Sequence, residues 1–235
     1  MRNFPSSADL SREQQAIYSE HLDKALLIIG PPGTGKTVMA ILRAQRMKDQ
    51  NNESATILMK SKVLKEFTRT QAKQINVDNY DKYLGRKYNL SPAEKRVNGN
   101  YQFPWDLIYN RTKFHLDISQ LKNIFPRQTI IDEGQDFPPV MWQLLSEIWI
   151  KLRKENINFV PSVMADENQR LNVDENSTID DIRKGLSLYT EFFDSFKESN
   201  LTKNYRNTKE IAAFGKHFYV GNQTETPIYD DCRSG

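Results

Sequence analysis

Short apolar runs recur along the chain, and each is followed by a polar stretch and then by a segment with apolar residues at helical spacing. The runs at 25–29, 56–59, 128–131 and 159–164 predict buried strands, and a fifth strand is expected at 199–201. Strands that alternate with helices in this way are typical of an α/β fold whose mostly parallel sheet is flanked by helices on both faces. Active residues are then expected at the carboxyl ends of the strands.

The alternation breaks between about residues 70 and 125, where aromatic residues are interleaved with lysine and arginine. One interpretation is a small helical insertion with its own core. The other is a surface on which the bases of single-stranded nucleic acid stack, since aromatic and basic side chains together suit that role. The acidic residues in the same stretch dilute the positive charge and favour the first interpretation, but the pattern leaves both open.

The segment that follows the first apolar run reads Gly-Pro-Pro-Gly-Thr-Gly-Lys-Thr and precedes a helical pattern. It fits every defined position of the phosphate-binding loop, in which glycines allow a tight turn and backbone N–H groups surround the phosphates. The lysine reaches the β- and γ-phosphates, and the last hydroxyl helps to hold Mg²⁺. The sequence therefore predicts binding of a nucleoside triphosphate. The predicted nucleotide-binding residues of this loop are Gly30, Pro31, Pro32, Gly33, Thr34, Gly35, Lys36 and Thr37.

Two adjacent acids, Asp132 and Glu133, follow the apolar run at 128–131. With a phosphate-binding loop upstream, an acid at such a strand end completes the Mg²⁺ site, and Asp132 is placed for that. Glu133 is placed to act as the general base that polarises the attacking water. We therefore predict Thr37 and Asp132 as metal ligands, and Glu133 and Lys36 as catalytic residues.

Gln14 lies upstream of the phosphate-binding loop and allows two interpretations. It stands three residues after Ser11, which makes a possible capping box at the start of a helix. Alternatively, the amide of Gln14 pairs with the N6 and N7 edge of adenine, because an amide offers both a donor and an acceptor. The residues alone do not separate these two roles.

Gln169 and Arg206 are further candidates for contact with the nucleotide. Gln169 follows the apolar run at 159–164 and is predicted to sense the γ-phosphate or the attacking water, which would link hydrolysis to a nucleic-acid site. Arg206 ends a Leu-Thr-Lys-Asn-Tyr-Arg segment, and its planar guanidinium suits a phosphate group. The structural alternatives are a polar turn at Gln169 and a solvated surface residue at Arg206.

Composition adds a few limits to this picture. The chain of 235 residues carries a net charge of +3, which permits a polyanionic partner without demanding one. Its single cysteine, Cys232, excludes an intramolecular disulfide and indicates a reducing, cytoplasmic setting. No apolar run approaches the ~18 residues of a membrane span, so we expect no membrane partner. A guanine-specific switch is disfavoured because the sequence contains no Asn-Lys-x-Asp stretch.

In their order along the chain, these segments resemble the N-terminal half of a superfamily 1 DNA or RNA helicase of the UvrD/Rep-like group. The resemblance rests on 10–16, the phosphate-binding loop, 130–136, Asp166 with Gln169, and 201–206. It implies a RecA-like fold, ATP and Mg²⁺ as ligands, and single-stranded DNA or RNA as a partner. The roles it implies are Gln14 at the adenine, Lys36 and Thr37 at the phosphates and Mg²⁺, Asp132 at Mg²⁺, Glu133 as base, and Gln169 and Arg206 at the γ-phosphate.

The sequence departs from that family in three respects. Ala165 stands where the family usually has glycine. Residues 60–64 are a poor match to the motif with which the family contacts the nucleic-acid strand. The later motifs of the family, including the arginine-bearing motif of a second RecA-like lobe, do not occur in this sequence. We therefore expect 1–200 to form the ATP-binding lobe and 201–235 to begin a second lobe or form an appendage. The missing lobe is expected in the full-length chain or in another subunit, and the present chain is expected to be weakly active or inactive alone.

Two functions from different classes follow from these observations. The resemblance implies the ATP-binding and hydrolysing motor half of an ATP-dependent DNA or RNA helicase or translocase. The alternative is an ATP-gated switch or assembly ATPase that does not unwind nucleic acid. An ATPase rate that rises with single-stranded nucleic acid would separate the first from the second.

Overall fold

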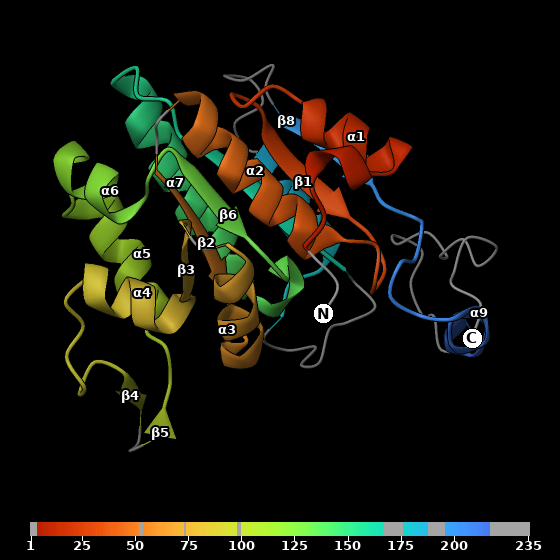
Figure 1. The fold of residues 1–235 in the computed structure, drawn as a ribbon. Helices are drawn as coiled ribbons and strands as arrows, with labels where there is room; N and C mark the ends of the chain where they lie inside the picture. Colours follow the sequence, from red (N-terminus) through yellow and green to blue (C-terminus); the bar gives the residue numbers. More distant parts are fainter. Residues whose placement is uncertain are drawn as a thin grey trace.

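The computed structural model describes residues 4–51, 54–72, 74–97, 100–166, 176–187 and 196–216. Within these residues its centre is a six-stranded sheet in which each neighbouring pair of strands is parallel (Figure 1). The strand order across the sheet is β3-β2-β6-β7-β1-β8. The strands are β1 (Ala25–Ile29), β2 (Ala55–Met59), β3 (Asn76–Asn79), β6 (Gln128–Ile131), β7 (Val160–Ala165) and β8 (Phe196–Asn200).

The predicted α/β fold is confirmed, and four of the predicted runs form β1, β2, β6 and β7 within one residue of the expected bounds. The last strand, β8, lies at 196–200 rather than at 199–201. The edge strand β3 was not predicted because three of its four residues are polar. Only its alternate side chains, Val77 and Asn79, are buried, as expected of a strand at the edge of a sheet.

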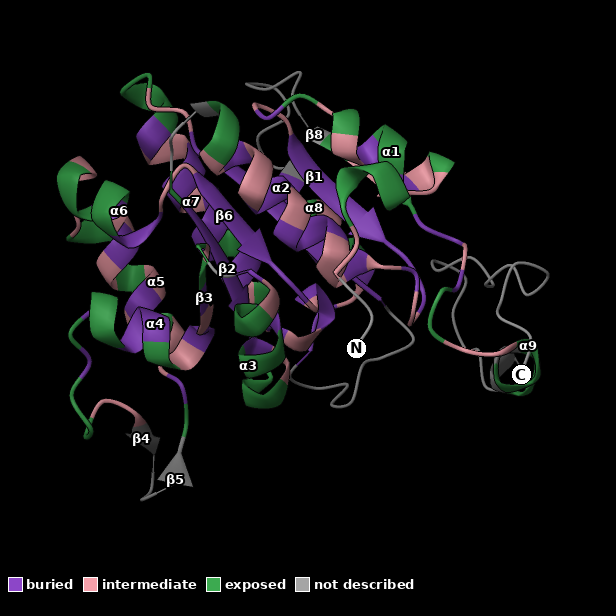
Figure 2. Ribbon diagram, viewed as in Figure 1, coloured by how far each residue is buried: buried purple, intermediate pink, exposed green. Residues whose placement is uncertain are grey.

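The two faces of the sheet carry separate cores, because successive side chains of a strand point to opposite faces. Ala25, Leu27 and Ile29 of β1 belong to one cluster of buried residues, whereas Leu26 and Ile28 belong to the other. The strands are accordingly buried throughout the centre of the sheet (Figure 2). Burial on both faces explains why these strands read as continuous apolar runs in the sequence.

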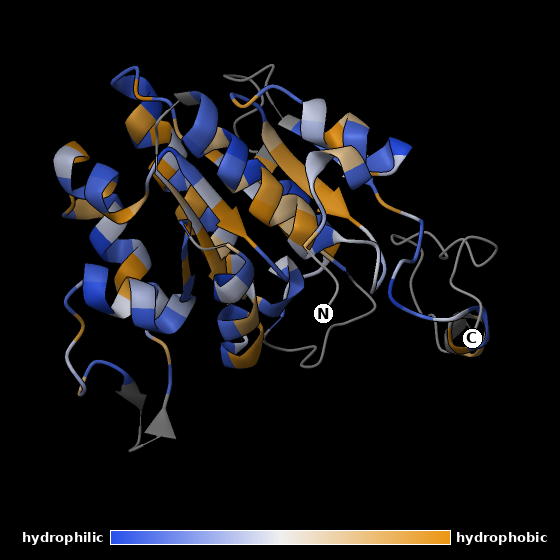
Figure 3. Ribbon diagram, viewed as in Figure 1, coloured by the Kyte–Doolittle hydropathy of each residue, from blue (hydrophilic) through white to orange (hydrophobic). Residues whose placement is uncertain are grey.

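The helices on one face of the sheet are α1 (Arg12–Ser19), α2 (Lys36–Asn51) and α3 (Lys62–Gln71). The orientation of α3 is unusual for an amphipathic helix. Lys65 and Thr68 are buried, whereas Val63 is 83% exposed and Phe67 is 58% exposed. Figures 2 and 3 show the same contrast, with hydrophobic positions on the exposed side of α3.

The helices on the opposite face are α5 (Trp105–Phe114), α6 (Ile118–Ile124), α7 (Pro139–Lys154) and α8 (Ile179–Ser187). The strongly apolar α7 packs on the sheet as its sequence indicates, and Trp142 and Trp149 are both buried. The indole N–H of Trp142 donates a hydrogen bond to Ser177 Oγ at 2.6 Å, which holds the segment before α8 against α7. This side of the molecule provides the larger core.

The segment between residues 70 and 125 adds α4 (Tyr80–Lys87) and a short antiparallel ribbon of β4 (Arg96–Val97) and β5 (Asn100–Tyr101) beside the sheet. The rings of Tyr80, Phe103, Trp105 and Phe137 form a cluster with centroid separations of 4.8–5.3 Å. Because Tyr80 and Phe103 are buried there, they do not present a stacking surface to nucleic acid. The segment is largely helical, and its buried residues share one core with the sheet and α7 rather than forming a separate one.

The remaining elements are the short 3-10 helices η1 (Ser7–Asp9) and η2 (Gly134–Asp136), and α9 (Lys209–Lys216), which stands apart from the sheet in Figure 1. None of the helices in the described part of the chain has the length and apolar character that a membrane span would need.

Candidate active site

The carboxyl ends of β1, β6, β7 and β8 meet at one edge of the sheet, and the loop at 30–37 leaves β1 there. Gly33 and Gly35 have φ angles of +86° and +93°, in the left-handed region that favours glycine. A Cβ atom on Gly33 would also lie 2.6 Å from Asn204 Oδ1, and one on Gly35 would lie 2.5 Å from Gln14 Nε2. Both glycines are therefore needed for the turn and for the close approach of other parts of the chain.

Asn204 holds the phosphate-binding loop from the far end of the sequence. Its Nδ2 donates a hydrogen bond to the carbonyl oxygen of Pro32 at 3.0 Å, and its Oδ1 accepts hydrogen bonds from the N–H groups of Arg206 and Asn207. The N–H of Tyr205 donates to the carbonyl of Gly33 at 2.8 Å. No role was predicted for Asn204 from the sequence, although it lies two residues before the predicted Arg206.

Gln14 lies behind the loop, and its side chain is nearly fully buried. Its Oε1 accepts a hydrogen bond from the N–H of Ser11 at 3.1 Å, and Ser11 Oγ accepts one from the N–H of Gln14, so the predicted capping box is confirmed. The Nε2 of Gln14 donates to the carbonyl of Thr34 at 3.0 Å. Both polar atoms of the amide thus make hydrogen bonds within the protein, and contact with adenine remains a prediction.

Lys36 is buried at the start of α2, and its ammonium group is turned back toward the loop. It donates hydrogen bonds to the carbonyl oxygens of Gly30 at 2.7 Å and Pro31 at 3.2 Å. Its Nζ also lies 3.9 Å from Asp166 Oδ2, at the end of β7. Both partners of this ion pair are buried, so the two charges compensate each other where water does not reach them.

Thr37 and Asp132 are brought together by the fold, although 95 residues separate them in the sequence. Thr37 Oγ1 donates a hydrogen bond to Asp132 Oδ2 at 2.8 Å. Burial, and next the charge of Glu133, raise the pKa of Asp132 to about 7, whereas the Thr37 hydrogen bond and the charge of Lys36 act in the opposite direction. A hydroxyl oxygen and a carboxylate are the hard oxygen donors that Mg²⁺ prefers, so the two side chains fit this ion.

Glu133 adopts a left-handed backbone conformation, with φ of +56° and ψ of +54°, which is uncommon for a residue other than glycine. Its Oε2 accepts a hydrogen bond from Gln135 Nε2 at 2.8 Å. Gln135 is buried, and its Oε1 accepts a hydrogen bond from the N–H of Asp166 at 2.9 Å. Gln135 therefore connects the predicted base, Glu133, to the end of β7 that contacts Lys36, a role that the sequence pattern does not predict.

Asp136 follows in the same acidic segment. Burial raises the pKa of Asp136, and the charge of Glu133 acts in the same direction, whereas Lys60 opposes them. Lys60 donates a hydrogen bond to the carbonyl of Asp136 at 3.3 Å, so the end of β2 supports the segment after β6. The acidic segment is thus held from two neighbouring strands.

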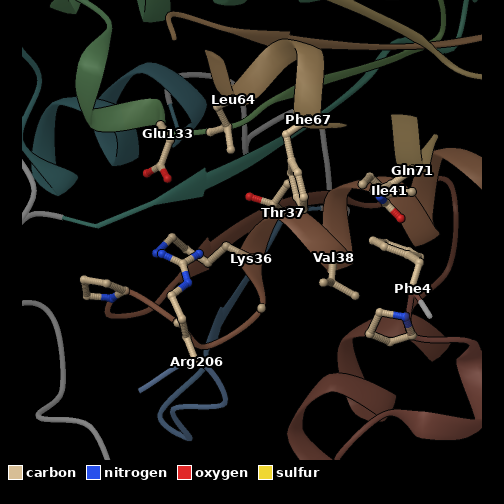
Figure 4. A pocket seen from close by; sticks show the side chains of 14 residues that line it. Phe4, Lys36, Thr37, Val38, Ile41, Leu64, Phe67, Gln71, Glu133 and Arg206 are labelled. Atoms are coloured by element: carbon tan, nitrogen blue, oxygen red, sulfur yellow. The ribbon is translucent and has the colours of Figure 1, made fainter. Parts of the chain in front are cut away.

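A pocket of about 550 Å³ opens in front of this edge of the sheet. Figure 4 shows that Glu133 and Arg206 point into the space beside Lys36 and Thr37. The rest of the pocket is apolar and extends between α2 and α3 toward the N-terminal segment. The lining residues at the polar end are Pro32, Gly33, Gly35, Lys36, Thr37, Glu133 and Arg206, and those at the apolar end are Phe4, Pro5, Val38, Ile41, Leu64, Phe67 and Gln71.

The structure therefore brings Lys36, Thr37, Asp132, Glu133 and Arg206 to one place. Gln14 supports the loop from behind and does not line the pocket. Gln169 lies outside the described residues, so its predicted position near the γ-phosphate remains a prediction.

Fold and site together define the class of protein, a phosphate-loop nucleotide-binding domain with a parallel α/β sheet. A family model described as an AAA domain matches residues 13–175, and the chain belongs to this family. No curated protein matches the chain at a significant level.

Among solved structures, the Pif1 helicase from Candida albicans superposes with a TM-score of 0.50 at 17% identity, covering 81% of this chain and 40% of that one. A Bacteroides Pif1 in complex with ADP-AlF4 gives a TM-score of 0.49 at 12% identity, covering 91% of this chain and 47% of that one. The superposition on the Candida albicans protein confirms the RecA-like fold expected from the resemblance to superfamily 1 helicases, whereas the UvrD/Rep-like group is not singled out. This chain spans less than half the length of these helicases.

Proposed function

We propose that the chain is the ATP-binding and hydrolysing motor lobe of an ATP-dependent DNA or RNA helicase or translocase. The observation that carries the proposal is the meeting of Lys36, Thr37, Asp132 and Glu133 at the polar end of a pocket large enough for a nucleotide. The family and the fold support it, because the Candida albicans protein of the same fold is a helicase.

The chain's own groups would bind the triphosphate by replacing contacts that they now make with each other. The N–H groups at the start of α2 and the glycine turn suit the phosphates. Lys36 would move from the carbonyls of Gly30 and Pro31 to the β- and γ-phosphates. Thr37 and Asp132 would hold Mg²⁺, which neutralises negative charge on the phosphate oxygens. The carboxylate form of Asp132 is the one that would bind the ion.

Hydrolysis needs a base for the attacking water and positive charge at the γ-phosphate. Glu133 faces the pocket and would accept the proton from the water. Arg206 lines the same end and would stabilise the charge on the phosphate in the transition state. Gln169 is proposed as the sensor that links this step to the nucleic-acid site.

A helicase motor acts on nucleic acid and closes a second RecA-like lobe over the nucleotide. We therefore propose single-stranded DNA or RNA as the partner, and a second lobe in the full-length chain or in another subunit. A reducing, cytoplasmic setting is consistent with the single cysteine. An ATP-gated switch or assembly ATPase would use the same phosphate site without a nucleic-acid partner.

The test begins with binding of ATP and Mg²⁺ to the purified chain, measured by titration calorimetry, with Lys36→Ala as the control that removes binding. The ATPase rate is then measured at low salt with and without single-stranded DNA and RNA, both for this chain and for a form that includes the second lobe. We expect low turnover from the chain alone and a several-fold rise with nucleic acid in the longer form. Nucleotide binding with a rate that nucleic acid does not change would favour the switch.

A further inference from the structure

The segment that carries Glu133 has an unusual shape. Glu133 has a left-handed backbone, and Gly134 packs so closely on β7 that a Cβ atom there would lie 2.6 Å from Val163 Cγ1. A backbone of this kind persists only where the surrounding contacts fix it. Gln135 holds the carboxylate of Glu133, but the backbone of the segment requires support of its own.

Ser177, two residues before α8, supplies that support from another part of the chain. Its N–H is shared between the carbonyl oxygens of Gln135 at 3.1 Å and Phe137 at 2.9 Å, and its Oγ donates to the carbonyl of Phe137 at 2.6 Å. These carbonyls lie at the end of η2, where a short helix leaves backbone acceptors without partners of its own. Because Ser177 is fully buried, water does not compete for these hydrogen bonds.

Ser177 is itself fixed, because α7 and α8 hold it. Its Oγ accepts a hydrogen bond from Trp142 Nε1 at 2.6 Å, so the hydroxyl both donates and accepts. Further along α8, Gly185 packs on α7 so closely that Trp142 leaves no room for a Cβ atom. Ser146 Oγ of α7 donates a hydrogen bond to the carbonyl of Gly185. These contacts along α8 keep Ser177 in place against the larger core.

The hydrogen bonds continue from Ser177 to the proposed general base. The backbone carbonyl of Gln135 accepts from Ser177, and the side-chain amide of Gln135 donates to Glu133 Oε2 at 2.8 Å. Glu133 faces the polar end of the pocket (Figure 4), whereas Ser177 is not among the residues that line it. Gln135 therefore transmits the position of Ser177 to Glu133.

We propose that Ser177 is a positioning residue for ATP hydrolysis, which holds the general base Glu133 in place without contacting the nucleotide. The proposal rests on the proposed function, because Glu133 needs a water molecule at the γ-phosphate to act on. The proton passes from that water to Glu133, and the base must lie within hydrogen-bond reach of it. Loss of the Ser177 hydroxyl should therefore lower kcat and leave KM for ATP nearly unchanged.

The experiment compares Ser177→Ala with Ser146→Ala, in the form of the protein that shows turnover in the test of the proposed function. Both variants remove a buried hydroxyl that donates to a backbone carbonyl beside α7 and α8, but only Ser177 touches the acidic segment. Ser177→Ala keeps the backbone N–H hydrogen bonds and nearly the same volume, so it should fold. We expect similar losses in the urea midpoint of both variants, and a roughly tenfold fall in kcat in Ser177→Ala alone.

A second measurement separates positioning from a general loosening of the fold. Because Ser177 acts through Glu133, Ser177→Ala should not lower the single-turnover rate of the Glu133→Gln variant any further. The proposal is overturned if Ser177→Ala leaves kcat unchanged, if Ser146→Ala lowers kcat equally, or if Ser177→Ala slows Glu133→Gln by the same factor as the unmodified protein. Absence of ATP hydrolysis in the unmodified protein would instead overturn the proposed function itself.

Discussion

The two ends of the pocket are built from different kinds of contact. At the polar end, Thr37 is bonded to Asp132, Glu133 to Gln135, and the loop carbonyl of Pro32 to Asn204, each across a turn or across distant parts of the chain. At the apolar end, the lining side chains come from α2, α3 and the N-terminal segment, and Phe67 is largely exposed to solvent.

This difference matters for the role proposed for the polar end. Stabilising a phosphoryl group in its transition state requires charges and dipoles that are already oriented, so the polar end must be held rigidly. Apolar contact depends on buried area and tolerates small displacements, so the side chains of α2, α3 and the N-terminal segment at the other end need no such fixed orientation. We therefore expect substitutions at the polar end to act on turnover and stability by large factors.

The largest effect is expected from Glu133→Gln at the polar end. Losing the general base should lower the ATPase rate by about 10²- to 10⁴-fold, while ATP binding is retained because the phosphate contacts remain. Steady-state turnover and titration calorimetry on the same preparation measure the two quantities. Glu155→Gln, an exposed glutamate at the end of α7, is the matched control. An ATPase rate in Glu133→Gln close to that of the unmodified chain would show that Glu133 is not the general base.

The next effect concerns the rigidity of the polar end. Asn204→Ala removes the hydrogen bond to Pro32 and leaves the N–H groups of Arg206 and Asn207 without their acceptor. We expect the free energy of unfolding to fall by about 1–3 kcal/mol, and tripolyphosphate binding to weaken with it. Urea denaturation measures the first, with Asn110→Ala on the surface of α5 as the control. Equal stability of the two variants would show that the loop holds its shape without Asn204.

The sequence was sufficient to predict the sheet and the polar end, for a physical reason. Buried parallel strands need continuous apolar runs, and their carboxyl ends meet at one edge, so Lys36 and Asp132 could be placed together. The polar edge strand β3 carries no such run and was missed. The contact between Asn204 and Pro32 joins residues 172 positions apart, and only the folded chain shows it.

The apolar end could not be predicted because periodicity identifies the face of a helix but not the direction in which it points. Val63, Leu64 and Phe67 read as the core-facing side of an amphipathic helix. In the structure the same helix turns Lys65 and Thr68 inward, and Val63 and Phe67 are exposed, whereas Leu64 packs partly against the core. Gln14 illustrates a related limit, since an amide suited to adenine is equally suited to a helix cap.

A smaller effect is expected from Gln135, which connects the proposed general base Glu133 to the end of β7. Gln135→Ala removes the hydrogen bond to Glu133 and the acceptor of the Asp166 N–H. We expect kcat to fall roughly tenfold because the base is less well placed, with little change in KM for ATP. Steady-state kinetics separate the two parameters, and Gln143→Ala on α7 is the control. A rise in KM with unchanged kcat would assign Gln135 to binding rather than to positioning.

The smallest effect concerns how the free energy of unfolding depends on pH because Asp132 is buried. Burial raises the pKa of Asp132 to about 7, so the folded chain keeps a proton that the unfolded chain releases near its ordinary value of about 4. Between these values the unfolded state binds fewer protons, and stability therefore falls as pH rises. From about pH 6.5 to 7.5 this contribution should be below roughly 1 kcal/mol, since only part of one proton is involved.

Asp132→Asn should lack this part of the slope when urea unfolding is measured across that range, whereas Asp106→Asn, at an exposed position of α5, should keep it. The lining residues of the apolar end include no titratable side chain, so Phe67→Ala should also keep the slope of the unmodified chain. Parallel slopes for Asp132→Asn and the unmodified chain would mean that Asp132 is ionised in the folded protein throughout this range.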